Sequence, residues 1–98
     1  MFTKDGSFAE YIVTDAIYCF PLANDVSFEQ GATSIGNPLS AVVMLEDIKA
    51  LKPRGVVQTA AFSQFGKMMI RLFRENNIPV VNIVRKDEHV ATLKEEYK

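Results

Sequence analysis

The stretch GVVQTAAFSQFGKMMIRLFRENNIPVVNIV, residues 55–84, decides the fold class of this 98-residue chain. Residues 55–60 (GVVQTA) and 78–84 (IPVVNIV) are short apolar runs of the kind that form buried strands. Between them, apolar side chains recur at the spacing of a one-sided helix: Phe65, Met68, Met69, Leu72 and Phe73. Strand, helix and strand in this order predict a βαβ unit with two parallel strands and a right-handed crossover.

The residues after the second strand predict one more helix. Asp87 is placed to cap its start, and Val90, Leu93 and Tyr97 share one face. A parallel sheet is normally covered on both faces and usually has several strands. We therefore interpret residues 55–98 as the opening half of a doubly wound α/β domain, and we expect the chain to be a piece of a larger protein or a truncated gene product.

A different pattern precedes this unit. Residues 7–13 (SFAEYIV) alternate and are rich in aromatic and branched side chains, which predicts a strand, and residues 16–20 predict a second extended piece. The lone cysteine, Cys19, has no cysteine or histidine partner at metal-ligand spacing, so we expect a buried apolar thiol. Tyr11 and Tyr18 are expected to pack within this strand region and not to act as catalytic acids.

Helices are predicted between the two patterns. Ser27 and Gln30 have capping-box spacing ahead of a short helix over residues 28–34. Pro38 suits the first turn of a second, longer helix with a broad apolar face. The run KPRG at residues 52–55 is expected to end that helix.

Composition excludes several classes of protein. A formal net charge of -1, with 48% hydrophobic and 23% charged residues, describes a globular chain without the basic excess of a nucleic-acid-binding protein. We interpret Lys67, Arg71 and Arg74 as the solvated face of one helix. No window approaches the roughly 18 apolar residues of a membrane helix, and the start MFTKDGSF lacks the apolar core of a secretory signal. We expect a soluble, intracellular protein with no membrane partner, and the sequence does not distinguish cytoplasm from mitochondrion.

Metal chemistry has no support in the sequence. The single histidine, His89, lies in the charged run KDEHV and is expected to be a surface residue. No set of side chains with zinc-ligand spacing surrounds it. We therefore predict no metal site.

The connection between the first strand and the helix has two interpretations. In a dinucleotide-binding turn, three glycines allow a tight bend, a close approach of the pyrophosphate, and close packing of helix and strand. The matching positions here are Ala60, Ser63 and Gly66, so only the packing glycine is present. As a phosphate turn, the segment would offer the Ser63 hydroxyl and the amides of Gln64 and Phe65 to an anion. As an ordinary strand-to-helix connection, it would bind nothing.

Two cations at the end of the second strand bear on the choice of cofactor. NAD sites usually place a carboxylate about 20 residues past the turn, where it holds the ribose 2′-hydroxyl. Arg85 and Lys86 lie nineteen and twenty residues after Gly66 (85 − 66 and 86 − 66). The planar guanidinium of an arginine can form bidentate hydrogen bonds to a 2′-phosphate, so NADP(H) is favoured if a dinucleotide binds. Alternatively, this pair merely begins a solvated loop.

Taken in order, four segments resemble the medium-chain dehydrogenase/reductase superfamily, specifically its zinc-free quinone reductase and enoyl reductase branches. They are GSFAEYIVTDAIYCFPLANDVSFEQGA, NPLSA, VVQTAAFSQFG and VVNIVRKDE, and they span nearly all of the chain. The resemblance implies an α/β fragment that joins the end of a GroES-like β catalytic domain to the first βαβα half of a Rossmann domain. Residues 1–36 would be the C-terminal part of the catalytic domain. Residues 37–98 would be the linking helix and the N-terminal half of the Rossmann NADP-binding domain.

The resemblance also implies roles for particular residues. The family's Asn-Pro-x-Thr-Ala segment, near the nicotinamide, corresponds to NPLSA here, so Asn37 and Ser40 are candidate nicotinamide contacts. The implied activity is hydride transfer from NADPH to a small-molecule quinone or an activated, enoyl-type C=C, and the full-length form is expected to be a homodimer if it follows the family. No catalytic residue is assigned, because the part that supplies the proton donor in enoyl reductases has no counterpart here. We expect no turnover from these 98 residues alone.

Two alternatives belong to other classes. The first is a truncated, non-catalytic reductase remnant that acts as a structural or binding subunit. The second is an unrelated βαβ domain that binds a different phosphate ligand.

Overall fold

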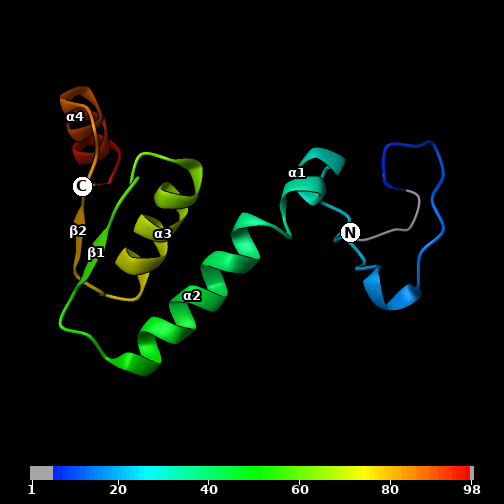
Figure 1. The fold of residues 1–98 in the computed structure, drawn as a ribbon, viewed down its shortest axis with the longest axis horizontal. Coiled ribbons are helices and arrows are strands. Elements are labelled where there is room, and N and C mark those ends of the chain that lie inside the picture. The colour runs from blue at the N-terminus through cyan, green and yellow to red at the C-terminus, as the bar shows by residue number, and fades with distance from the viewer. Residues whose placement is uncertain (1–5, 98) are drawn as a thin grey trace. The chain divides into compact units, whose positions relative to one another are not determined.

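The computed structural model describes residues 6–97, in which the chain divides into two compact units between Gly31 and Ala32. The elements in chain order are η1 (Ala16–Tyr18), α1 (Phe28–Thr33), α2 (Asn37–Leu51), β1 (Val56–Gln58), α3 (Gln64–Glu75), β2 (Val80–Asn82) and α4 (Asp87–Glu96) (Figure 1). In the part of the chain that the structure describes, no helix is both long and apolar enough to traverse a bilayer.

The predicted βαβ unit is confirmed. β1 and β2 pair in parallel, with Val56 opposite Val80, Val57 opposite Val81, and Gln58 opposite Asn82. The chain passes from β1 to β2 through α3, which lies beside the strands in Figure 1. The predicted strand runs were longer than the observed ones, because only three residues of each strand find ladder partners.

The main core lies where α3 packs against α2 and one face of the sheet. Its buried members come from the two helices, and half-buried valines of the strands pack against them: Ala41, Leu45, Met69, Phe73, Val56 and Val80. Met69 and Phe73 are each only 1% exposed, so the apolar stripe predicted for α3 is the face that covers the sheet.

The opposite face of the sheet is bare within residues 6–97. Val57 and Val81, which are register partners, remain 67% and 62% exposed. Since successive side chains of a strand point to opposite faces, these valines point away from α3. Parallel sheets are normally covered on both faces, so this side of the sheet is a surface that the described chain does not bury.

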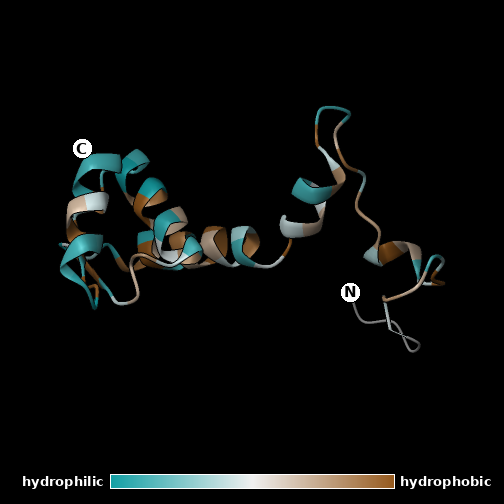
Figure 2. Ribbon diagram, turned by 90° about the horizontal axis from the view of Figure 1, so that it is seen from above, coloured by the Kyte–Doolittle hydropathy of each residue, from teal (hydrophilic) through white to brown (hydrophobic). Residues whose placement is uncertain are grey.

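A second, smaller cluster holds α4. Leu93 of α4 is buried with Ala61 and Ile70, and the remainder of the helix is mainly hydrophilic (Figure 2). The prediction that Asp87 caps this helix is wrong. Lys86 is the N-cap residue, with extended backbone angles (φ -133°, ψ 140°) and no side-chain cap. Asp87 is already the first helical residue, where its charge favours the positive end of the helix dipole.

The predicted strands of the first unit are wrong. Residues 7–13 form no strand, and three of residues 16–20 form the short 3-10 helix η1. A strand needs a neighbour for its backbone hydrogen bonds, and residues 6–36 contain no other strand that could supply one. The predicted burial of Tyr11, Tyr18 and Cys19 is wrong for the same reason. Tyr11 and Tyr18 are 90% and 52% exposed, and the thiol of Cys19 is exposed.

The predicted helices before the βαβ unit are confirmed. The Ser27 amide donates to Gln30 Oε1 at 2.9 Å, and the Gln30 amide donates to Ser27 Oγ at 3.3 Å, which is the reciprocal pair of a capping box. Hydrogen bonds from its own backbone amide and from the Ser27 hydroxyl hold the pKa of Glu29 below its usual value. α2 then starts with Pro38 in its first turn and ends at a left-handed Lys52 (φ 48°).

Candidate functional site

The turn between β1 and α3 bends at Ala60. Its φ is 51°, a left-handed conformation that costs a residue with a side chain about 1–2 kcal/mol. The Ser63 amide donates to the Ala60 carbonyl at 2.9 Å and closes the bend. Ala60 is one of the small residues of this turn, and the backbone there adopts a conformation that glycine would take without strain.

Replacing Ala60 with glycine is therefore expected to stabilise the chain by about 0.5–1 kcal/mol, because the relief of strain exceeds the added entropy of the unfolded chain. Ala50→Gly, inside α2, is the matched control and is expected to destabilise by about 1 kcal/mol. Urea unfolding of both variants checks the prediction. A loss of stability in Ala60→Gly would show that the turn is not strained at this residue.

At the third glycine position, Gly66, the backbone of α3 lies close to the backbone of the turn. A Cβ on Gly66 would lie 2.6 Å from the Ala61 carbonyl oxygen and 2.7 Å from that of Ala60. The turn is also tied to the sheet, since Gln58 Nε2 donates to the Gly66 carbonyl and to Asn82 Oδ1, both at 3.1 Å. This polar pair was not predicted from the sequence, although Gln58 and Asn82 are each the third residue of a strand and face the same side.

The start of α3 leaves two hydrogen-bond donors without partners. Ser63 is the N-cap residue, and its Oγ accepts from the Gly66 amide at 3.0 Å. The amides of Gln64 and Phe65 have no hydrogen-bond acceptor among residues 6–97. The first amides of a helix point outward along the positive end of its dipole, so these two are available to an anion. The Ser63 hydroxyl keeps its own proton for donation.

Ser63→Ala is expected to destabilise the chain by about 1 kcal/mol, because the Gly66 amide loses its cap. Ser63→Asp keeps a capping oxygen and is expected to retain stability while weakening the binding of any phosphate ligand through charge repulsion. Thermal unfolding measures the first effect and nucleotide titration the second. Equal phosphate affinity in wild type and Ser63→Asp would exclude an anion at this helix start.

A pocket of about 260 Å³ opens beside this turn, and we call it the turn pocket. It is lined by Ala60, Phe62, Ser63, Val84, Arg85 and His89. The structure thus brings Ser63 of the turn and Arg85 of the loop between β2 and α4, both predicted site residues, into one cavity. Neither Asp nor Glu is among the residues that line it.

An aromatic stack forms one side of the turn pocket. The rings of Phe62 and His89 lie 3.8 Å apart between centroids, with an angle of 5° between their planes. Lys67 Nζ is 4.4 Å from the centroid of the same Phe62 ring. The prediction of a surface histidine is therefore wrong in part: the His89 side chain is only 25% exposed, because Phe62 covers its ring. Phe62 was not singled out from the sequence, since no spacing rule links it to a residue of α4.

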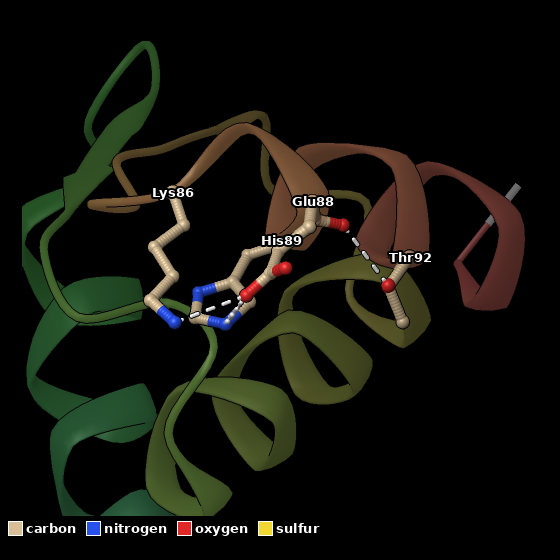
Figure 3. A network of polar contacts seen from close by, with 4 residues as sticks. All are labelled: Lys86, Glu88, His89 and Thr92. Atoms are coloured by element: carbon tan, nitrogen blue, oxygen red, sulfur yellow. Dashed lines mark hydrogen bonds and ion pairs between the residues drawn. The ribbon is translucent and has the colours of Figure 1, made fainter.

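Lys86 lies next to the turn pocket in an ion-pair network (Figure 3). Its Nζ is 3.1 Å from Glu88 Oε1, and His89 Nε2 lies 3.7 Å from the same oxygen. The Lys86 side chain is 65% exposed and does not line the pocket. Of the two predicted 2′-phosphate ligands, Arg85 is thus in the pocket and Lys86 is beside it.

The side chains of Gln64 and Phe65 do not line the turn pocket. Phe65 packs against the core between α2 and α3, and Gln64 lines a separate cavity of about 780 Å³ together with the basic side chains of α3. In that cavity Lys67 pairs with Glu96 at 3.3 Å, so the basic row is only partly solvated. What Gln64 and Phe65 offer at the turn is their backbone amides.

Asn37 and Ser40 are not brought to the turn pocket. Both are exposed at the start of α2, and the Ser40 amide donates to the Gly36 carbonyl at 3.2 Å as part of the helix. Their assignment as nicotinamide contacts stays a prediction.

The fold and the turn together define the class of structure: a parallel βαβ unit with two partnerless amides at the start of its helix. Comparison with known proteins then finds similar reductases. No family model matches the chain. The chain is 39% identical over 80 residues to the mitochondrial enoyl-[acyl-carrier-protein] reductase of Caenorhabditis elegans. The aligned residues cover 81% of this chain and 23% of that protein. The corresponding Arabidopsis thaliana enzyme is 32% identical over 83 residues, covering 84% of this chain and 22% of that protein.

A solved structure agrees with these relatives. A Mesorhizobium loti protein assigned as an NADPH:quinone reductase superimposes with a TM-score of 0.75 at 38% identity, over 83% of this chain and 24% of that one. The chain thus spans about a quarter of the length of the relatives that it matches. These similarities support the predicted resemblance to the quinone reductase and enoyl reductase branches of the medium-chain dehydrogenase/reductase superfamily.

Proposed function

We propose that this chain is the cofactor-binding segment of an NADPH-dependent oxidoreductase that acts on a quinone or on an activated, enoyl-type C=C. The observation that carries the proposal is the turn pocket, in which a helix start with two partnerless amides lies beside Arg85. The names of the similar proteins support the same activity, since they specify an enoyl reductase and an NADPH:quinone reductase. When bound, NADPH supplies the hydride, and the protein binds and orients it.

The residues of the turn fit the phosphates of such a cofactor. The pyrophosphate is assigned to the amides of Gln64 and Phe65 and to the Ser63 hydroxyl, where the helix dipole favours an anion. The 2′-phosphate is assigned to Arg85, with Lys86 next to it. No carboxylate lines the pocket, and the carboxylate beside it, Glu88, is paired with Lys86 at 3.1 Å.

The remaining assignments rest on the family resemblance. Asn37 and Ser40 at the start of α2 are proposed to contact the nicotinamide. Residues 1–36 are proposed to belong to a GroES-like catalytic domain and residues 37–98 to the first half of the Rossmann cofactor domain. The proposed acceptor is a small molecule, and no residue of this chain is assigned a catalytic role.

A comparison of the two nicotinamide cofactors tests the proposed function. NADPH is expected to raise the unfolding temperature of the protein that carries this segment more than NADH does at equal concentration, because ligands that bind the folded state stabilise it by mass action. The 2′-phosphate is the sole difference between the two ligands. Protection by NADH without protection by NADPH would contradict the cofactor assignment.

Hydride transfer is tested separately. We expect the full-length protein to consume NADPH when a quinone or an enoyl thioester is added. The 98 residues alone are expected to give no turnover, because orienting a hydride needs both walls of the cleft. NADPH oxidation by the isolated chain would overturn that expectation.

A further inference from the structure

We infer that His89 regulates the turn pocket, so that its affinity for a 2′-phosphate rises when the imidazole is protonated. This inference rests on the proposed function, because it takes Arg85 as a ligand of that phosphate. Histidine is the side chain whose charge ordinarily changes between pH 5 and 8. His89 lines the same pocket as Arg85, and it is therefore placed to add or remove one positive charge there.

The Phe62 stack holds the imidazole in place. The two rings are nearly parallel (5°) at 3.8 Å, and the side chain is only 25% exposed. His89 Nε2 approaches Glu88 Oε1 at 3.7 Å. A ring held in this orientation loses less side-chain entropy on binding a ligand than a mobile surface histidine would.

The charges around His89 favour an anion as the additional partner. From α4, the helix that carries His89, the Glu88 carboxylate faces the imidazole. Lys86 Nζ already forms an ion pair with the same Glu88 oxygen at 3.1 Å. From α3, Lys67 lies over the Phe62 ring, and from the loop between β2 and α4, Arg85 lines the pocket. Two of these cations already have carboxylate partners, Lys86 with Glu88 at 3.1 Å and Lys67 with Glu96 at 3.3 Å. A protonated His89 therefore adds a positive charge to a pocket in which Arg85 is the lining cation and no carboxylate is among the lining residues. A phosphate dianion relieves this excess, whereas a ribose 2′-hydroxyl does not.

Nuclear magnetic resonance tests the inference directly, because His89 is the only histidine in the chain and its imidazole signals are unambiguous. The signals are followed through a pH titration with saturating adenosine 2′,5′-bisphosphate and, as control, with 5′-AMP. With the bisphosphate, the midpoint of the His89 titration is expected to move to higher pH. By linkage this corresponds to about 3- to 10-fold tighter binding by the protonated protein. With 5′-AMP the midpoint is expected to stay in place.

The His89→Gln variant separates charge from structure. A 2′-phosphate itself titrates near pH 6, and this contribution is the same in both proteins. The ratio of wild-type to variant affinity for the bisphosphate is therefore expected to be about 3- to 10-fold larger at pH 6 than at pH 8. If His89 only supported the turn through Phe62, the variant would bind more weakly by the same factor at both pH values.

The outcomes distinguish this inference from the function on which it rests. Preferential binding of the bisphosphate with a moved His89 midpoint supports both. Preferential binding with an unmoved midpoint overturns the role of His89 and leaves the cofactor assignment standing. Equal binding of the bisphosphate and 5′-AMP overturns the 2′-phosphate site and the inference together.

Discussion

Replacing Gly66 with alanine is expected to lower the free energy of unfolding by about 3 kcal/mol. Alanine normally stabilises the interior of a helix by up to about 1 kcal/mol relative to glycine. Here the added Cβ would meet the carbonyl oxygens of Ala61 and Ala60 at 2.6 and 2.7 Å, and these are backbone atoms that cannot rotate away. The helix must move from the strand, and the hydrogen bond from Gln58 Nε2 to the Gly66 carbonyl is strained or lost.

Gly36→Ala is the matched control for this substitution. A Cβ on Gly36 meets nothing within 4 Å, so its stability is expected to change by less than about 1 kcal/mol. Urea unfolding of both variants gives the comparison. If Gly66→Ala were as stable as the wild type, α3 and the turn would not be packed as closely as the structure shows.

Replacing Arg85 with glutamine is expected to weaken NADPH binding about 10- to 100-fold, since a hydrogen bond to a charged group contributes about 1.5–3 kcal/mol. NADH binding is expected to change little, because NADH has no 2′-phosphate for the guanidinium to hold. The preference for NADPH over NADH should therefore be lost. Isothermal titration of each cofactor measures the effect without requiring turnover.

Arg74→Gln is the control for the loss of one positive charge. Arg74 is exposed and lines the separate cavity beside α3, not the turn pocket. Its substitution is expected to leave the NADPH preference intact. Equal losses in Arg85→Gln and Arg74→Gln would mean that the overall charge of the surface, and not a defined phosphate ligand, attracts the cofactor.

The fold of the second unit could be predicted because its hydrophobic pattern and its packing agree. The apolar stripe of α3 identified Met69 and Phe73, and the structure buries both against the sheet. The first unit could not be predicted in the same way. The alternating pattern of residues 7–13 describes a chain that is able to form a strand, but a strand exists only when another strand pairs with it, and the described residues of that unit provide none.

The candidate site could be predicted only where a residue type has a local backbone reason. Gly66 was predicted as the packing glycine, and the structure shows that a Cβ there would meet backbone atoms of the turn. Ser63 was predicted as a small residue of the turn that offers its hydroxyl to a phosphate, and the structure shows in addition that it caps α3. The stack of Phe62 on His89 joins residues far apart in the sequence and follows no period of helix or strand. Its position depends on where the first turn of α4 packs, which only the tertiary structure defines.

The most direct test of the central claim is to map where a 2′-phosphate nucleotide binds on this chain. Adenosine 2′,5′-bisphosphate is titrated while backbone amide signals are recorded by nuclear magnetic resonance. We expect the largest shifts at the amides of Gln64 and Phe65, at the start of α3, and at the amide of Arg85, in the loop between β2 and α4. No shifts at these amides, or the largest shifts along the basic row of α3, would contradict it.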